Sequence, residues 1–291
     1  MQKFDENTLR SLSKGVSCYY IKPDIDEFIN DLHGMTYEVL DASSRRDISA
    51  TIRPFGAYNI YEISNQKEYI NLGIVLNSDL LYNETQKVGE YKFKNKRRKL
   101  AYIEEFKYLL IILLEKYFAH KVNIKMNNNS LWIESIYLLG ANFRIFVFAQ
   151  NFSSDKMLTI SSSDIMPYSF DIDLFEKNFM MKNIKTKDNF GKICNVIKSI
   201  CIDAQISEDA FVIESIIYNM DDKLFTGFIN EQLFKIFNEE KFILNSNFVS
   251  IDSKGDKKLF TNKFLFPNGI YKTKMKYNKL IDVFASEDIT I

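Results

Sequence analysis

The stretch YINLGIVL at residues 69–76 carries a clear strand pattern, on which the expected fold rests. Its even-numbered positions are all Ile or Leu, so they share one face of an extended strand. The odd-numbered positions Tyr69, Asn71 and Gly73 share the opposite face. We expect the aliphatic face to pack in the core of the protein. The other face is then available to line a site.

Other periodic segments lie around this strand. Residues 100–118 carry apolar side chains at helical spacing and predict the strongest helix of the chain. Residues 130–137 and 142–149 alternate like strands and are joined through Gly140, which predicts a β-hairpin. A shorter strand is expected at 51–53.

The two ends of the chain are mainly helical in pattern. Residues 1–50 are mostly helical and polar, with a break at Pro23, and the helical pattern returns from about Pro167. Three later segments have apolar residues at spacings of three and four: 190–202, 207–219 and 229–242. We therefore expect an α+β protein, with an α/β core in residues 1–155 and a helical domain in residues 156–291.

Composition excludes several classes of protein. With 46% hydrophobic and 26% charged residues among 291, the chain resembles globular proteins and not disordered ones. Its three cysteines are widely spaced and it has only two histidines, which argues against a disulfide framework or a zinc site. The most apolar run, at 108–114, is far shorter than the roughly 20 residues of a membrane span. We expect a cytoplasmic protein that does not enter membranes.

Several weak motifs occur in a meaningful order. PFGAY at 54–58, YINLGIV at 69–75, SLWI at 130–133 and FRIFV at 143–147 follow one another. They resemble the P-x-G-S-Y turn, the D-I-D-L-G-V-V strand and the S-V-x-I … F-x-I-D-V hairpin of polymerase-β-superfamily nucleotidyltransferases. FVIESIIYNM at 211–220 is similar to the F-L-L-E-S-L-V-Y-N-V-P helix of oligoadenylate-synthetase-like proteins, which include the bacterial cyclic-oligonucleotide synthases (CD-NTases) of antiphage defence.

The resemblance implies a mixed sheet of the nucleotidyltransferase type with flanking helices, followed by a helical C-terminal half. In that family a Gly-Ser turn holds the triphosphate, and three aspartates hold two metal ions that activate the attacking hydroxyl. In this chain Ala57 takes the place of the serine. Tyr69, Asn71 and Phe146 take the places of the three aspartates.

A different alignment would not restore the acids, because neither 69–78 nor 143–149 contains Asp or Glu. The resemblance therefore implies degenerate catalytic motifs, with no confident catalytic residue, no metal site and no confident cofactor. Lys198 falls on the lysine that reaches nucleotide phosphates in the family. The positions implied in nucleotide binding are Gly56, Ala57, Tyr58, Asn71, Arg144 and Lys198.

The leading hypothesis is a pseudoenzyme that uses this fold as a regulatory module, with antiphage defence as a candidate setting. It would bind a nucleotide, an oligonucleotide or a partner protein. Arg144 and Phe146 alternate onto one strand face, so a cation and an aromatic ring could replace phosphate recognition through metal ions.

Two alternatives remain. The first is an active, magnesium-dependent nucleotidyltransferase that makes an oligonucleotide signal or modifies RNA with displaced acids, for which Asp171, Asp173 and Glu68 are candidates. Asp171 and Asp173 lie where a helix is expected to begin, so capping is the favoured role for them. The second is a scaffold that contacts nucleic acid through the basic run from Lys92 to Lys99, although such runs are more often solvated surfaces.

Overall fold

The computed structural model describes most of the chain as two compact units. The sheet unit lies within Cys18–Asn59 and Tyr69–Ile172, and the helical unit contains the first helix and everything described from Asp173 onward. The described residues are 5–14, 22–45, 47–55, 69–79, 81, 101–119, 122–127, 130–135, 142–150, 157–159, 168–206, 210–239, 247–261, 275–276, 278–280 and 282.

The sheet unit is built on a mixed sheet, as expected from the sequence. In the described part of the chain this sheet has seven strands. Five follow the order β1-β2-β5-β4-β3, while β6 pairs with β5 and β7 pairs with β6. The pairing of β2 with β5 is parallel, and the other pairings are antiparallel. The strands are β1 Ser49–Phe55, β2 Tyr69–Asn77, β3 Val122–Asn127, β4 Ser130–Ser135, β5 Asn142–Gln150, β6 Met157–Thr159 and β7 Tyr168–Phe170.

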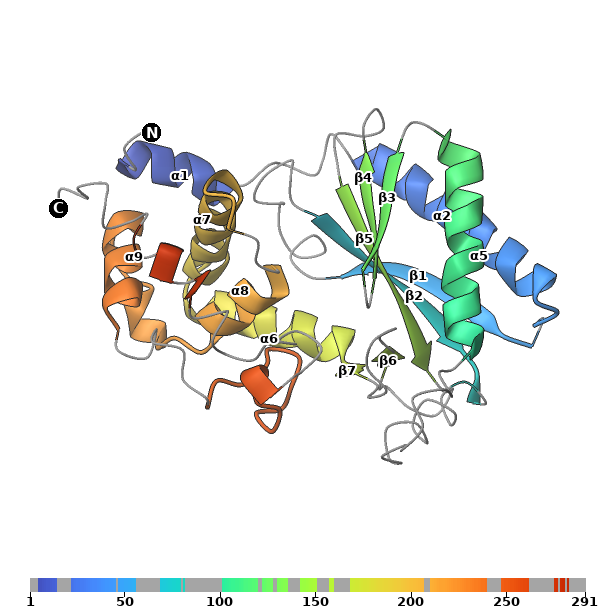
Figure 1. The fold of residues 1–291 in the computed structure, drawn as a ribbon. Coiled ribbons are helices and arrows are strands. Elements are labelled where there is room, and N and C mark those ends of the chain that lie inside the picture. Colours follow the sequence, from blue (N-terminus) through green and yellow to red (C-terminus); the bar gives the residue numbers. More distant parts are fainter. Residues whose placement is uncertain are drawn as a thin grey trace. The chain divides into compact units, whose positions relative to one another are not determined.

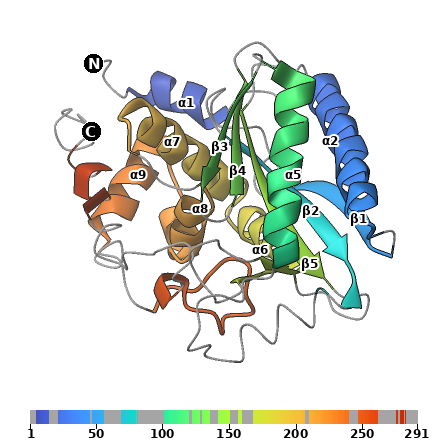
Figure 2. The ribbon, with the colours of Figure 1, turned by 45° about the vertical axis from the view of Figure 1, so that its right-hand side comes forward.

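Two helices cover one face of this sheet (Figures 1 and 2). They are α2, Lys22–Ala42, and α5, Ala101–Phe118, and they pack against each other. The ring of Phe28 on α2 lies 4.2 Å from the ring of Phe143 on β5 and 5.5 Å from that of Phe118 on α5. The aliphatic face of β2 is buried on this side of the sheet, as its alternation predicted.

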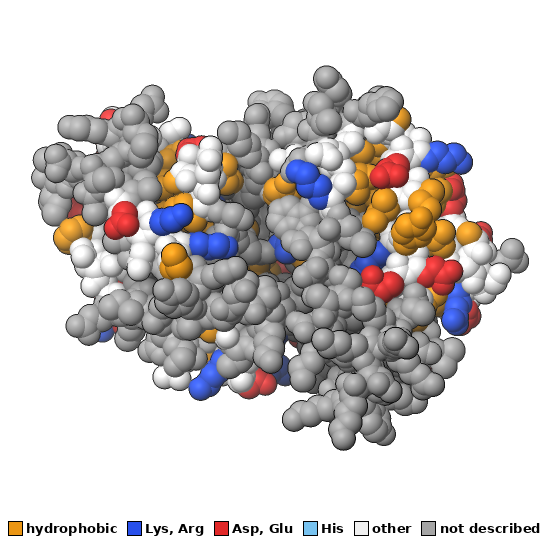
Figure 3. Space-filling view, viewed as in Figure 1, with side chains coloured by type: hydrophobic (Ala, Val, Ile, Leu, Met, Phe, Trp, Pro, Cys, Tyr) orange, Lys and Arg blue, Asp and Glu red, His pale blue; other side chains and the backbone are white. Residues whose placement is uncertain are grey.

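The outer side of α5 carries exposed apolar side chains, and Figure 3 shows hydrophobic groups gathered there among acidic ones. Tyr108 and Ile112 are exposed on this side. The hydroxyl of Tyr117 donates to Glu38 Oε1 at 2.6 Å, which links α5 to α2 at the surface.

The helical unit packs around a cluster of buried phenylalanines that includes Phe179, Phe190 and Phe225. Helix α1 belongs to this unit, since the carboxylate of Glu6 accepts hydrogen bonds from the backbone N–H groups of Ile229 and Asn230. Its helices are α1 Glu6–Lys14, α6 Ile172–Lys185 (whose first residue is in the sheet unit), α7 Asn189–Asp203, α8 Ala210–Tyr218 and α9 Ile229–Asn238, with 3₁₀ turns at Asp222–Leu224 and Leu259–Thr261.

The structure adds short elements to those predicted from the sequence. The strand β3 at 122–127 was not predicted, and β7 occupies part of a stretch that was expected to be helical. The units divide between residues 172 and 173 because β6 and β7 carry the sheet beyond residue 155. Among the helices described, none is both long enough and apolar enough to cross a bilayer.

Candidate functional site

The candidate site lies on the face of β2 and β5 that faces away from α2 and α5. In the parallel register of these strands, Asn71 pairs with Arg144 and Gly73 pairs with Phe146. Paired residues of neighbouring strands project from the same face of a sheet. The structure thus brings together Asn71, Arg144 and Phe146, three residues that the sequence placed in one site.

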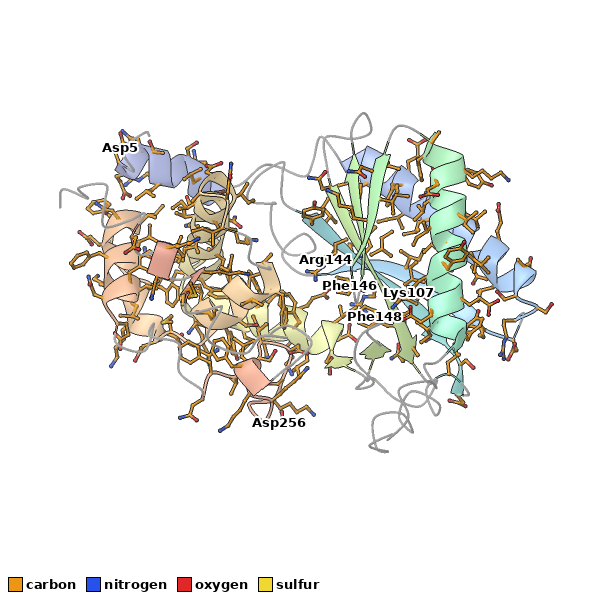
Figure 4. All side chains as sticks on the ribbon, in the orientation of Figure 1. Asp5, Lys107, Arg144, Phe146, Phe148 and Asp256 are labelled. Carbon is orange, nitrogen blue, oxygen red and sulfur yellow. The ribbon has the colours of Figure 1, made fainter. Side chains whose placement is uncertain are left out.

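Arg144, Phe146 and Phe148 form a row along β5 (Figure 4). The guanidinium carbon of Arg144 lies 4.6 Å from the centre of the Phe146 ring. The rings of Phe146 and Phe148 are stacked, with centres 5.9 Å apart and planes inclined by 21°. Phe146 is only 7% exposed, so an aromatic ring fills the position that the resemblance assigns to the third aspartate.

Gly73 leaves the space that this row of rings needs. A Cβ atom at residue 73 would lie 3.2 Å from Cε2 of Phe148 and 3.6 Å from Cδ1 of Ile172, the first residue of α6. The first distance is tighter than ordinary van der Waals contact. The glycine therefore serves close packing between β2, β5 and the start of α6.

Arg144 is half-buried on this face. Removal of the guanidinium from water lowers the pKa of Arg144 to about 9, and the nearby Tyr69 opposes that shift. The side chain therefore stays charged at neutral pH. A partly desolvated cation gains more from an anion than a fully hydrated one would, because screening by water is weaker there.

Arg53 is a second cation on the same face, and sequence reasoning missed it. The antiparallel register of β1 and β2 pairs Arg53 with Gly73, which in turn pairs with Phe146. From ordinary strand spacing and rise, the Cα atoms of Arg53 and Arg144 lie ~12 Å apart. A strand was expected at 51–53, but only its register against β2 reveals which face Arg53 occupies.

The residues on these strands do not fit a pair of magnesium ions. Magnesium prefers oxygen ligands and is usually held by one or two carboxylates, yet β1, β2 and β5 contain no Asp or Glu. The positions that the resemblance assigns to the three aspartates hold the phenol of Tyr69, the amide of Asn71 and the buried ring of Phe146. Within the described residues there is also no group of three or more His, Cys, Asp or Glu side chains that could hold a metal ion.

Lys198, the remaining predicted binding residue within the described part, lies in the helical unit. Its Nζ atom is 3.2 Å from Oε1 of Glu214, and both side chains are 2% exposed. The pair joins α7 to α8 inside the unit. A role of Lys198 in phosphate binding would require the ammonium to leave this buried ion pair.

The acids considered for the alternative enzyme lie at the start of α6. Asp171 directly precedes the helix and is half-buried, while Asp173 is exposed in its first turn. The predicted helix start is therefore confirmed. The positions Gly56, Ala57, Tyr58 and Glu68, and the basic run from Lys92 to Lys99, lie outside the described residues.

Comparison with known proteins identifies the fold. No protein-family model matches the sequence, and no curated protein matches it either. Among solved structures, the CdnE cyclic dinucleotide synthase of Elizabethkingia meningoseptica, solved with GTP and Apcpp, is similar with a TM-score of 0.66 and 16% identity. That likeness covers 96% of this chain and 98% of the synthase.

Two further synthases give the same result. The CdnE c-UMP-AMP synthase of Rhodothermus marinus has a TM-score of 0.61 at 16% identity over 99% of this chain and 98% of its own. The DncV cyclic AMP-GMP synthase of Vibrio cholerae has a TM-score of 0.56 at 12% identity over 100% of this chain and 87% of its own. The chain therefore has the nucleotidyltransferase fold of the bacterial cyclic dinucleotide synthases.

Proposed function

We propose that this protein is a nucleotidyltransferase-fold pseudoenzyme that binds a nucleotide or oligonucleotide as a regulatory module. The observation that carries this proposal is the composition of the site face. Tyr69, Asn71 and Phe146 occupy the positions that the resemblance assigns to the metal-binding carboxylates, and Arg144 lies against the Phe146 ring. Neutral side chains cannot replace carboxylates in a mechanism that depends on two metal ions.

The known proteins of similar fold support a nucleotide ligand. The E. meningoseptica synthase was solved with GTP and an ATP analogue, and the V. cholerae synthase with GTP. In this chain an arginine and an amide occupy neighbouring register positions on the central strands. Such groups suit phosphate oxygens, since Arg offers a planar fork of donors and Asn offers an NH₂ group. Because the neighbours are cyclic dinucleotide synthases, we propose that the bound ligand is a nucleotide signal that another enzyme makes, with antiphage defence as the setting.

Calorimetric titration tests this function. The purified chain is titrated with mononucleotides and cyclic dinucleotides, and thermal unfolding is followed in parallel. We expect saturable binding of at least one of them, and about ten- to hundred-fold weaker binding in Arg144→Gln, the loss typical of a hydrogen bond to a charged group. No heat and no thermal shift with any nucleotide would refute a nucleotide-binding role and leave a partner protein as the ligand.

The alternative is an active enzyme with displaced acids, and one contact gives it a basis. Ile172 would touch a side chain at residue 73, and Asp171 directly precedes Ile172 in the sequence. An acid is thus one residue away from a side chain that lies near β2, although it is not on β2. If Asp171 supplied a metal ligand, the chain would form a metal-dependent product from labelled triphosphates, and Asp171→Ala would abolish it.

A further inference from the structure

We propose that the site face of β1, β2 and β5 recognises one phosphate group of a nucleotide directly, without a divalent metal ion, and discriminates against triphosphates. The ligand class is therefore a nucleoside monophosphate ester, open or cyclic. This inference rests on the proposed function and specifies the charge and the metal requirement of the ligand.

The charge balance of the three strands is the first argument. They carry Arg53 and Arg144 and no acidic residue, so their formal side-chain charge is +2. A phosphomonoester carries about −1.5 to −2 charges at neutral pH, and a phosphodiester carries one. To either group the three strands offer cationic side chains and no carboxylate. A triphosphate carries several more charges, which divalent ions ordinarily neutralise in phosphoryl-transfer sites.

The geometry at Arg144 is the second argument. Its guanidinium is held 4.6 Å from the Phe146 ring centre, and Phe148 backs that ring. A guanidinium fixed on an aromatic face loses less freedom when it binds an anion than a mobile one does. The row of rings therefore orients the cation, much as a carboxylate cluster would orient a metal ion.

Asn71 is the third argument. It pairs with Arg144 in the register, so the two side chains project from neighbouring positions on the same face. An amide can donate to a phosphate oxygen and does not repel it, whereas an aspartate at this position would repel a phosphate unless a metal ion lay between them. The amide at residue 71 and the arginine at residue 144 thus favour the same metal-free contact.

The experiment compares ligands of one base that differ in phosphate charge. AMP, 3′,5′-cyclic AMP and ATP, and the same guanosine series, are titrated into the full chain with EDTA and again with magnesium. We expect at least one monophosphate of a series to bind at least ten-fold more tightly than the triphosphate in EDTA. We also expect magnesium to change the affinity for that monophosphate less than two-fold.

Conservative variants test whether the positions of Asn71 and Arg144 are responsible. Asn71→Asp should weaken monophosphate binding in EDTA about ten-fold, because it adds a negative charge beside Arg144. The matched control is Asn77→Asp, the same change on the same face of β2, about 20 Å along the strand. Asn77→Asp should bind as the natural chain does. Arg144→Lys keeps the charge but loses the planar fork, and should bind about ten-fold more weakly.

The outcomes separate this inference from the function on which it depends. Binding that requires magnesium, or tighter binding of ATP than of both monophosphates in EDTA, overturns the metal-free monophosphate site while nucleotide binding stands. Equal effects of Asn71→Asp and Asn77→Asp also overturn it, because the loss would then not depend on proximity to Arg144. The absence of binding by any nucleotide refutes the proposed function itself.

Discussion

Gly73 shows how one small residue shapes the site. It lies between Arg53 of β1 and Phe146 of β5 in the register, and its missing side chain admits the ring of Phe148. The alternation of the sequence predicted that Gly73 lies on the site face. It did not predict that the ring of Phe148 packs over this glycine. That contact depends on which strand lies beside β2, which is a long-range property of the fold.

A pair of alanine substitutions tests this role. Gly73→Ala should lower the free energy of unfolding by about 1–3 kcal/mol, the usual cost of overfilling a packed core. Gly34→Ala is the control: it lies within α2 with nothing within 4 Å of a new Cβ atom. Since alanine favours helices over glycine, Gly34→Ala should raise stability by roughly 0.5–1 kcal/mol.

Urea unfolding followed by circular dichroism measures both changes. An unchanged or higher stability of Gly73→Ala would mean that Phe148 moves aside without cost. The account of close packing over residue 73 would then be wrong.

At the scale of elements, the Glu214-Ser215-x-x-Tyr218-Asn219 stretch contacts other parts of the helical unit. It covers the end of α8 and the residue that follows it. Glu214 pairs with Lys198 of α7, and the hydroxyl of Ser215 accepts from the backbone of Ile251 at 3.5 Å. The side chain of Asn219 donates to the carbonyl of Val249 at 2.8 Å and accepts from its N–H at 2.9 Å. This stretch carries the most specific resemblance to oligoadenylate-synthetase-like proteins. Its side chains therefore stabilise the helical unit.

The Lys198–Glu214 pair offers a test of this structural role. Lys198→Met would leave the Glu214 carboxylate buried beside an apolar side chain, so we expect a loss of about 3–5 kcal/mol in stability. The double variant Lys198→Met/Glu214→Leu removes both charges and should recover most of that loss.

Denaturant unfolding of the single and double variants gives the coupling energy, and calorimetry of the folded double variant tests the predicted role of Lys198 in nucleotide binding. The two single variants are Lys198→Met and Glu214→Leu. If the double variant lost as much stability as the two single variants together, a direct coupling would be contradicted. Unchanged nucleotide affinity in the double variant would assign Lys198 to the fold alone.

The elements that sequence analysis predicted well are long and periodic. The alternation of β2, the hairpin of β4 and β5 and the helix at 100–118 all appear in the structure with boundaries within a few residues. The missed strands β3 and β7 are short, with 6 and 3 residues. The alternation of VNIKMN could have revealed β3, whereas the three residues of β7 carry too little pattern and depend on pairing with β6. Arg53 was missed for the same reason, because its face follows from register.

At the scale of the whole molecule, we propose that the fold is kept while the chemistry of the site has changed. The likeness to the E. meningoseptica synthase extends over 96% of this chain at 16% identity. Buried apolar positions tolerate substitution as long as pattern and volume are kept, whereas a metal site depends on a few carboxylates. A chain can therefore lose a metal site while it keeps its apolar core and its fold.

The proposed function requires the loss of metal-dependent catalysis, and a product assay tests that loss. The purified chain is incubated with labelled ATP, GTP, CTP and UTP, singly and mixed, with magnesium or manganese, and the products are separated by chromatography. The E. meningoseptica synthase, assayed alongside, verifies the conditions. We predict that this chain returns the triphosphates unchanged. A product that forms with metal and disappears with EDTA would refute the proposed loss of catalysis.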